Sequence, residues 1–342
     1  MKCMLTCGAG IMEYSEKERP AAGPGEAVIK VRAASVCGGD VTRYKSAPMK
    51  DVYVIPGHEF SGDIVEIRDG GERYAVGDRV CIFPNPYCGT CPECRAGRFN
   101  LCTHKKSIGN NGQNGPVDGG MAEYCKVPVR SLIKLDDSVS YEQGALVEPV
   151  AVGLHASRAA GDVRGQKVLV YGAGAIGLYT IMFLKMQGAE RIYALDVLPE
   201  HLEMAERYGA DCTMLCEGNF AERIREDSGC GIDIVFDTVC LPPSISATQK
   251  LLRGGGSSVW IAIRNMQQEI NIFPTVFHEQ KIFTSFIYYK SEMEEAAGMM
   301  GRGEINCEDT ITDRVPLSQG KALFEDLVHN PGAHIKAQFR ID

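Results

Sequence analysis

One segment near the middle of the chain restricts its fold more than any other. Val168 to Tyr171 is an apolar run typical of a buried strand, and it leads directly into Gly172-Ala-Gly174-Ala-Ile-Gly177 and then a helical stretch, 178–186. In such a unit the first glycine permits a tight turn, the second lets the backbone approach a pyrophosphate, and the third lets helix and strand pack closely. The segment therefore predicts a dinucleotide site at a helix N-terminus, where backbone N–H groups favour an anion.

An acidic residue at the end of the next predicted strand indicates which dinucleotide binds. Asp196 follows the run Arg191 to Leu195 and lies 19 residues after Gly177. A carboxylate at this position accepts hydrogen bonds from the adenosine ribose hydroxyls and repels a 2′-phosphate. We therefore expect NAD rather than NADP. The alternative is that the glycines only shape a turn and that Asp196 is a solvated strand end.

Length and charge narrow the class of protein. A chain of 342 residues fits two domains, and a net charge of -8 repels nucleic-acid phosphates and anionic lipid surfaces. We expect neither a nucleic-acid nor a membrane partner. The first twenty residues lack the apolar core of a signal peptide, and four of the fourteen cysteines cluster at metal-ligand spacing. These features favour a protein of the reducing cytoplasm.

The pattern of apolar runs changes about halfway through the chain. Up to about residue 150, short Val/Ile-rich runs alternate with Gly/Pro-rich turns, which predicts a β-rich, barrel-like domain with strands at 27–31, 63–67, 79–83 and 122–127. Beyond that point strands alternate with helices, which predicts a parallel, doubly wound sheet. Its strands are expected at 167–171, 191–195, 213–215, 232–237 and 257–263. Further elements are expected as helices at 292–300 and 318–327, and as strands near Thr310 and at 335–341, the last joining the first domain.

Four cysteines on one short loop predict a structural metal site. Cys88, Cys91, Cys94 and Cys102 have the spacing C-x2-C-x2-C-x7-C, in a segment rich in proline and glycine. Four thiolates satisfy the closed tetrahedral coordination of a structural Zn²⁺. An iron–sulfur cluster is the rival occupant, because a cage of four thiolates also suits it. Buried cysteines without a metal are the third possibility.

A second set of ligand types is dispersed along the chain. Cys37 lies in SVCGGD, the pair His58-Glu59 in PGHEF, and Glu148 in LVEPVAVGLH. A thiolate, an imidazole and one or two carboxylates make a mixed zinc site that can keep one position open for water or an alcohol. Each residue alone has an ordinary structural explanation, and sequence spacing does not show that the four meet.

The chain as a whole resembles the zinc-containing medium-chain dehydrogenases, in particular their sorbitol, butanediol and threonine dehydrogenase branch. The matching motifs run in order through SVCGGD, PGHEFSG, VGDRV, CGTCPEC, GGMAEY, LVEPVAVGLHA and VYGAGAIG. The resemblance implies an α/β protein with a GroES-like β-barrel catalytic domain and a doubly wound, parallel-sheet Rossmann domain. The catalytic domain would comprise 1–151 and 286–342, and the Rossmann NAD-binding domain 152–285. It also implies a homo-oligomer, a tetramer or a dimer.

The same resemblance implies roles for individual residues. Two Zn²⁺ ions and NAD are expected, with the catalytic zinc held by Cys37 and His58 and by Glu59 and Glu148 as direct or water-mediated ligands. Asp40 would accept a hydrogen bond from His58, although it could also be a helix-capping residue. The cofactor is expected to contact Gly172, Gly174, Ile176, Gly177, Asp196, His201, Phe286 and Ile287. Of these, His201 stands where the branch more commonly has arginine.

The chain differs from this branch at the residues that would carry the substrate proton to solvent. Relatives commonly carry Ser or Thr two residues after the zinc cysteine and a histidine three residues further on, whereas this chain has Gly39 and Thr42. Our hypothesis is that Glu59, Glu148 or a substrate hydroxyl replaces this proton relay. The simpler alternative is that Gly39 only eases a turn and that catalysis is slow.

The expected activity is transfer of a hydride from a secondary alcohol of a polyol, cyclitol or vicinal diol to NAD, giving a ketone. The alternatives are an L-threonine 3-dehydrogenase and a polyol-phosphate dehydrogenase, for which Arg43, Lys45 and Lys50 are the nearby cations. A binding protein without catalysis is disfavoured because the zinc ligands are kept. Candidate pocket walls are Tyr44, Phe83, Tyr288 and Tyr289, each of which could equally be core packing.

Overall fold

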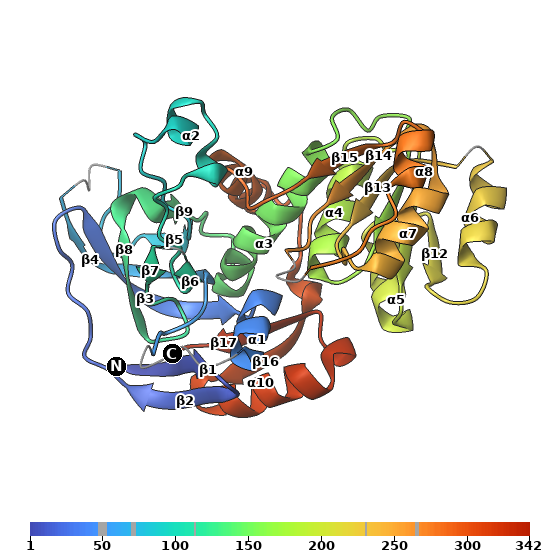
Figure 1. The fold of residues 1–342 in the computed structure, drawn as a ribbon. Coiled ribbons are helices and arrows are strands. Elements are labelled where there is room, and N and C mark those ends of the chain that lie inside the picture. Colours follow the sequence, from blue (N-terminus) through green and yellow to red (C-terminus); the bar gives the residue numbers. More distant parts are fainter. Residues whose placement is uncertain (47–52, 70–72, 113, 230, 264–266) are drawn as a thin grey trace. The chain divides into compact units, whose positions relative to one another are not determined.

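The computed structural model describes residues 1–46, 53–69, 73–112, 114–229, 231–263 and 267–342. Its chain divides into two compact units, one of Met1–Glu148 with Tyr289–Asp342 and the other of Pro149–Tyr288. The first boundary between the two units, from Glu148 to Pro149, lies inside helix α3 (Tyr141–Arg158). Each unit has its own apolar core. Each is also built on its own sheet, as the ribbon shows (Figure 1).

The first unit is built on a seven-stranded sheet with the order β16-β17-β3-β4-β5-β9, in which β8 also pairs with β3. These strands are β3 (Glu26–Ser35), β4 (Glu59–Arg68), β5 (Arg79–Ile82), β8 (Tyr124–Pro128), β9 (Leu132–Lys134), β16 (Ile311–Pro316) and β17 (Lys336–Arg340). The predicted strands at 27–31, 63–67, 79–83 and 122–127 correspond to β3, β4, β5 and β8. The closing strand also forms as expected, since β17 pairs antiparallel with β3.

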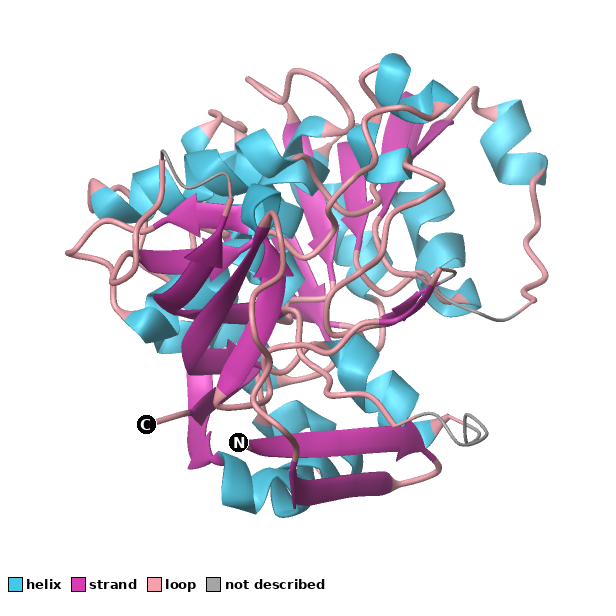
Figure 2. Cartoon of the chain, turned by 90° about the vertical axis from the view of Figure 1, so that its left-hand side faces the viewer, coloured by secondary structure: helices cyan, strands magenta, loops and turns pink. Residues whose placement is uncertain are grey.

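A hairpin, a short ladder and several helices complete this unit. The hairpin of β1 (Lys2–Gly8) and β2 (Ile11–Glu16) carries the N-terminus and lies against α10 (Figure 2). The helices are α1 (Gly38–Lys45), α2 (Pro92–Arg95), α9 (Lys290–Gly301) and α10 (Gly320–His329), with single 3-10 turns η1 (Phe99–Leu101), η2 (Val129–Ser131), η3 (Glu308–Thr310), η4 (Leu317–Gln319) and η5 (Pro331–Ala333). The ladder consists of β6 (Asn111–Gly112) and β7 (Gly115–Pro116). Met4, Ile29, Phe60 and Phe339 are among the fully buried side chains of the core.

The second unit is a parallel six-stranded sheet with the order β12-β11-β10-β13-β14-β15. Its strands are β10 (Lys167–Tyr171), β11 (Arg191–Asp196), β12 (Cys212–Leu215), β13 (Ile232–Asp237), β14 (Leu252–Trp260) and β15 (Lys281–Thr284). Its helices are α4 (Ala175–Met186), α5 (Pro199–Arg207), α6 (Phe220–Ser228), α7 (Pro242–Leu251) and α8 (Phe273–Phe277). The order is that of a dinucleotide-binding fold, and the predicted doubly wound sheet is confirmed.

Some predicted element ends were wrong. The strand expected at 257–263 begins at Leu252 and ends at Trp260. The strand expected near Thr310 does form, as β16, which begins at Ile311 directly after the turn η3. The helix expected at 318–327 begins at Gly320 and extends to His329. Element ends of this kind depend on sheet pairing and capping, which the apolar pattern alone does not specify.

Candidate metal and cofactor sites

The four loop cysteines converge on one point. The sulfur atoms of Cys88, Cys91, Cys94 and Cys102 all lie within 4.8 Å of one another. The separations include 4.0 Å between Cys88 and Cys94 and 3.9 Å between Cys91 and Cys102. Zinc with four sulfur ligands at about 2.3 Å separates its sulfurs by about 3.8 Å, so this cage fits the ion.

Backbone N–H groups aimed at the sulfurs favour thiolates in the cage. The N–H groups of Thr90 and Cys91 donate to Cys88 Sγ, and these bonds lower the pKa of Cys88 to about 5. The pKa of Cys91 is lowered to about 6 by bonds from the backbone of Cys94 and Thr103, whereas burial raises that of Cys94 to about 12. These bonds therefore favour, at Cys88 and Cys91, the thiolate form that a metal requires.

The dispersed ligands come together in the same unit. Ligand atoms of Cys37, His58 and Glu59 lie within 4.8 Å of one another. Cys37 is the N-cap of α1, while His58 immediately precedes β4 and Glu59 begins it. The register of β3 on β4, which pairs Ser35 with Glu59, accounts for this meeting.

A glycine turn sets the direction of His58. Gly57 has φ = 99°, in the left-handed region, and Gly109 packs so closely that a Cβ there would lie 2.0 Å from the Gly57 carbonyl oxygen. Neither position accepts a side chain without movement of the backbone. The sharp turn before His58 therefore depends on glycine at both positions.

Glu148 is the predicted ligand that stands outside this group. It is buried on α3 and is not a member of the three-residue cluster. Its charge is nevertheless close enough to help raise the pKa of both His58 and Lys336. The structure thus brings together three of the four predicted ligands and leaves the fourth nearby.

Asp40 lies beside His58, but the two side chains are too far apart for the predicted hydrogen bond. Its Oδ1 is 3.9 Å from His58 Nδ1 and 3.6 Å from an Arg43 nitrogen, while its Oδ2 accepts a bond from the Cys37 N–H. Burial lowers the pKa of His58, but the charges of Cys37 and Asp40 outweigh it and hold that pKa well above its ordinary value. Because Nδ1 faces Asp40, Nε2 is the nitrogen left for a metal. Asp40 also caps α1 through its Oδ2, so the structure contains the capping contact, whereas the hydrogen bond to His58 stays a prediction.

Sequence reasoning missed a lysine at this centre. Lys336, at the start of β17, is buried with 5% of its side chain exposed, and its Nζ donates to Glu59 Oε2 and, at 3.2 Å, to the Val36 carbonyl. Burial lowers the pKa of Lys336, but the charges of Glu59 and Cys37 raise it above its ordinary value overall. A lysine in a strand of mixed polarity carries no sequence pattern that distinguishes it from a surface residue.

The remaining predicted residues of the first unit have ordinary contacts. The Thr42 hydroxyl is exposed and donates to the Gly38 carbonyl at 3.0 Å within α1. A Cβ at Gly39 would lie 3.7 Å from Cys37 Sγ, an ordinary contact distance. Tyr44 packs in the core against Phe324, and the Tyr289 ring meets Phe99 edge-on. Phe83 is buried in this unit, as is Tyr288 in the other.

The glycine motif forms the predicted turn in the second unit. Gly172 has φ = 93°, and a Cβ at Gly177 would lie 1.9 Å from the Gly172 carbonyl oxygen, so neither position tolerates a side chain. A Cβ at Gly174 would meet nothing within 4 Å, so open space surrounds the N-cap of α4. No side chain caps this helix, which leaves its first N–H groups available to an anion, and Ile176 is half-buried in its first turn.

Asp196 and His201 form a buried pair at the end of β11. Asp196 Oδ2 lies 3.4 Å from His201 Nδ1 and accepts a bond from the Ala173 N–H at 2.7 Å. Burial raises the pKa of Asp196, but the neighbouring His201 side chain and the bonds from backbone N–H groups outweigh it and lower that pKa overall. The carboxylate is thus fixed beside the glycine turn. Phe286 and Ile287 follow β15, and Ile287 has φ = 59°, a strained value for a β-branched residue.

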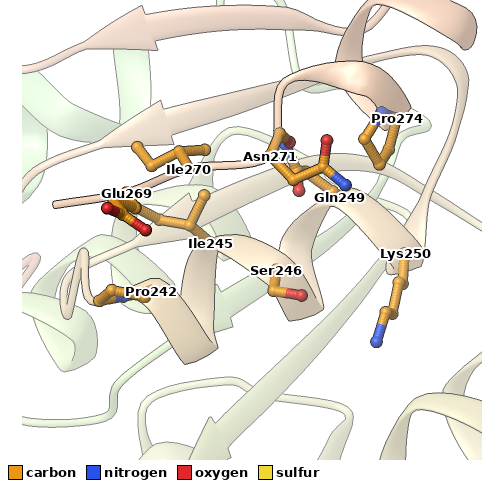
Figure 3. A pocket seen from close by; sticks show the side chains of 9 residues that line it. All are labelled: Pro242, Ile245, Ser246, Gln249, Lys250, Glu269, Ile270, Asn271 and Pro274. Carbon is orange, nitrogen blue, oxygen red and sulfur yellow. The ribbon is translucent and has the colours of Figure 1, made fainter.

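A cavity of about 300 Å³ also lies in this unit, between α7 and the segment 269–274 (Figure 3). Its walls include Ile245 and Gln249 from α7 and Ile270 and Asn271 from the facing segment. None of the predicted site residues lines it. It therefore adds nothing to the metal groups or the glycine turn.

Within the described residues, the structure contains no helix that is long and apolar enough to cross a membrane.

Comparison with known proteins gives consistent matches over nearly the whole chain. Residues 23–137 match the alcohol dehydrogenase GroES-like domain, and residues 175–302 match the zinc-binding dehydrogenase domain. A probable D-xylulose reductase A of Neosartorya fischeri is 30% identical over 337 residues, which are 94% of this chain and 93% of the relative. Sorbitol dehydrogenase 1 of Saccharomyces cerevisiae is 30% identical over 90% of this chain and 88% of its own.

A solved structure has a similar fold. The 2R,3R-butanediol dehydrogenase of Bacillus subtilis superposes with a TM-score of 0.89 at 29% identity, covering 100% of this chain and 99% of that one.

Proposed function

Because the chain belongs to the zinc-dependent medium-chain dehydrogenases, we propose that it oxidises a secondary hydroxyl of a polyol, cyclitol or vicinal diol to a ketone, with NAD as the hydride acceptor. The observation that carries this proposal is the convergence of Cys37, His58 and Glu59 in the GroES-like part of a chain that also holds a glycine turn with Asp196 beside it. Three proteins that are similar over most of their length are named for a ketose (D-xylulose), a polyol (sorbitol) and a diol (2R,3R-butanediol).

Two zinc ions per chain are assigned to different tasks. Cys88, Cys91, Cys94 and Cys102 would hold the structural ion, since all four positions are filled by sulfur. Cys37 and His58, with Glu59 or Glu148, would hold the catalytic ion in a catalytic domain of residues 1–151 and 286–342. The Rossmann domain, 152–285, would bind NAD through Gly172, Gly174, Ile176, Gly177, Asp196, His201, Phe286 and Ile287.

The bound groups would supply Lewis acidity toward the substrate hydroxyl and a hydride acceptor. The chain's own residues would orient the metal ligands and accept the substrate proton. Asp40 would orient the ring of His58 through Nδ1, which lies 3.9 Å from its Oδ1, and Arg43 lies near the same carboxylate oxygen. Glu148 is buried and its charge acts on His58, and in this proposal its carboxylate would take the substrate proton, because the Thr42 hydroxyl is engaged within α1.

The contacts of Arg43 weigh against a phosphorylated substrate. Its guanidinium lies beside Asp40 and donates to the Gly109 carbonyl and the Asn110 side chain. Lys45 is exposed at the end of α1, and Lys50 is outside the described residues. A phosphate would need cations that are not already committed to protein acceptors.

A substrate screen tests the proposal. Purified protein is expected to oxidise sorbitol, butanediols or inositols while it reduces NAD. The kcat/KM for at least one of these substrates should exceed that for L-threonine or polyol phosphates by about tenfold or more, a difference of about 1.4 kcal/mol in transition-state binding. NADH absorbance measures the rates. Turnover confined to threonine would establish the amino-acid alternative, and turnover confined to a phosphate ester the phosphate one.

Asp196 is expected to enforce the use of NAD. Asp196→Asn keeps the size of the side chain and an oxygen acceptor but removes the charge that repels a 2′-phosphate, so the ratio of kcat/KM for NADP to that for NAD should rise about tenfold or more. Asp211→Asn is the matched control, because Asp211 also accepts a backbone bond, from Ile192, at the start of β11. A wild-type enzyme that already prefers NADP would contradict this role.

We assign homo-oligomer formation to one apolar surface of the Rossmann unit. This edge surface consists of β15 with Ile272, Phe273, Val276 and Phe277. All four residues of β15 are exposed at the edge of its sheet, and Phe273, Val276 and Phe277 are each about two-thirds exposed or more. An uncovered edge strand beside a large apolar patch suits pairing with a second copy, and a two-fold axis would join two sheets into one. Two such dimers would make the proposed tetramer.

Sedimentation of a charged variant tests this surface. Phe273→Glu/Phe277→Glu is expected to sediment as a smaller species than the wild type, because two buried carboxylates would oppose association through this surface. Val76→Glu, at an exposed apolar residue of the other unit, should leave the assembly unchanged. A double variant that sediments like the wild type would place the interface elsewhere.

We place the protein in the cytoplasm. All thirteen cysteines among the described residues are free thiols, and Cys230 lies outside that description. A reducing compartment keeps such thiols available to metals.

A further inference from the structure

The pairing of β3 with β4 stops short of two of the dispersed metal ligands. Its last pair is Ser35 with Glu59, so Cys37 lies two residues beyond the ladder and His58 one residue before it. Cys37 caps the N-terminus of α1, and His58 follows the sharp turn at Gly57. Sheet register brings the two segments together, but a further contact is needed to fix their separation.

One side chain joins these two segments. Arg43 lies in the last turn of α1, with 12% of its side chain exposed. Its Nη1 donates to the Gly109 carbonyl at 3.2 Å, and its Nη2 donates to the Asn110 side chain. The guanidinium also lies 3.6 Å from Asp40, whose Oδ2 accepts the Cys37 N–H at 3.1 Å. The planar fork of Arg43 therefore spans from the first turn of α1 to the loop at Gly109.

The loop that Arg43 contacts is packed directly on the turn before His58. A Cβ at Gly109 would lie 2.0 Å from the Gly57 carbonyl oxygen, and a Cβ at Gly119 would lie 2.2 Å from the same atom. Backbones packed this closely leave no room for one to move without the other. A shift of Gly109 would therefore be passed to Gly57 and to the histidine that follows it.

The helix that carries Arg43 is anchored without it. The Ser46 carbonyl, at the end of α1, accepts from the Ala9 N–H at 2.7 Å. The Tyr44 carbonyl accepts from the Gly10 N–H at 2.8 Å, and the Tyr44 ring is buried in the core of this unit. Loss of the guanidinium should therefore leave the fold intact and loosen only the fit between the two ligand segments.

We propose that Arg43 is a positioning residue that fixes the separation of Cys37 and His58 and thereby sets the affinity of the catalytic metal site. This inference rests on the proposed function, because it takes the Cys37, His58 and Glu59 group to hold the catalytic zinc. Ligand atoms must lie within about 0.2 Å of their preferred distances from the metal, so loosely joined segments bind it more weakly. Arg43 touches neither substrate nor cofactor in this role.

Competition with a zinc chelator tests the proposal without reference to turnover. Zinc-loaded protein should release its two ions in separate steps, and Cys37→Ser, which lacks one step, identifies the catalytic ion. Arg43→Met keeps the length of the side chain but not the fork, so the affinity for that ion should fall about tenfold or more while the other step is unchanged. Arg32→Met is the matched control, because Arg32 is also partly buried and joins β3 to β4 through Asp63.

Two further measurements separate positioning from charge and from a general loss of structure. Arg43→Lys keeps a positive charge near Asp40 but cannot donate through a planar fork to Gly109 and Asn110, so it should bind the catalytic ion about as weakly as Arg43→Met. In cobalt-substituted protein at saturating metal, the visible ligand-field bands of the catalytic ion should change in both variants. The bands of the four-cysteine site should remain those of the wild type.

The outcomes separate this inference from the function on which it rests. Wild-type protein that binds one zinc per chain would refute the assignment of the catalytic centre itself. Two zinc ions per chain with equal affinities in wild type and Arg43→Met would overturn the role of Arg43 alone. An Arg43→Lys variant with wild-type affinity would also overturn it, because charge would then suffice without the fork. If Arg43→Met does not fold, Asn110→Ala, which removes one acceptor of the fork, should weaken the same step and gives the same comparison.

Discussion

Cys37→Ser is expected to abolish turnover while the protein stays folded. The thiolate is one of the few ligands of the proposed catalytic zinc, and serine does not replace it as a ligand at neutral pH, so kcat should fall by about 10³-fold or more. The fold should persist because serine is a good N-cap. Cys37 caps α1, its Sγ accepting from the Gly39 N–H, and a hydroxyl there does the same.

Three measurements check this expectation together. NADH absorbance gives the rate, metal analysis should find one zinc per chain in place of two, and the melting temperature should stay close to that of the wild type. Cys212→Ser is the matched control, since Cys212 is also half-buried but belongs to β12 in the other unit. A Cys37→Ser enzyme with two zinc ions and wild-type turnover would remove Cys37 from the catalytic centre.

Cys91→Ser is expected to damage folding instead. Cys91 is buried in the cage, where the cysteines pack with Tyr87 and Phe99, and few other apolar contacts hold this loop. Zinc binding in small structural sites contributes about 10–16 kcal/mol, and this energy is also folding energy. Loss of one sulfur leaves an incomplete cage, so we expect a fall in melting temperature of about 10 °C or more.

Calorimetry and limited proteolysis between residues 84 and 108 measure this effect. Cleavage in that segment should become faster in Cys91→Ser and stay unchanged in Cys37→Ser. If the two variants lost the same metal and the same stability, the division into a structural and a catalytic ion would be wrong.

The elements predicted most accurately are those whose sequence pattern is locally complete. β10 and β13 begin and end where the apolar runs indicated, and α4 follows the glycine turn. These strands lie inside a parallel sheet, so an unbroken apolar run defines them. The β1–β2 hairpin and β15 were not predicted. β15 is exposed along its whole length, so burial leaves no pattern in it, and its pairing with β14 alone defines it.

The sequence by itself determined the parts of the sites whose residues are close in the chain. The four cysteines lie within 15 residues and can meet only within that loop, and the glycine turn follows from the order strand, glycines and helix. Only the tertiary structure brings together the dispersed residues of the proposed catalytic metal site. Cys37, Glu59 and Lys336 meet because β3 pairs Ser35 with Glu59 on one side and with Gln338 on the other. A strand pairing over some 300 residues is set by the register of the whole sheet, and no local spacing encodes it.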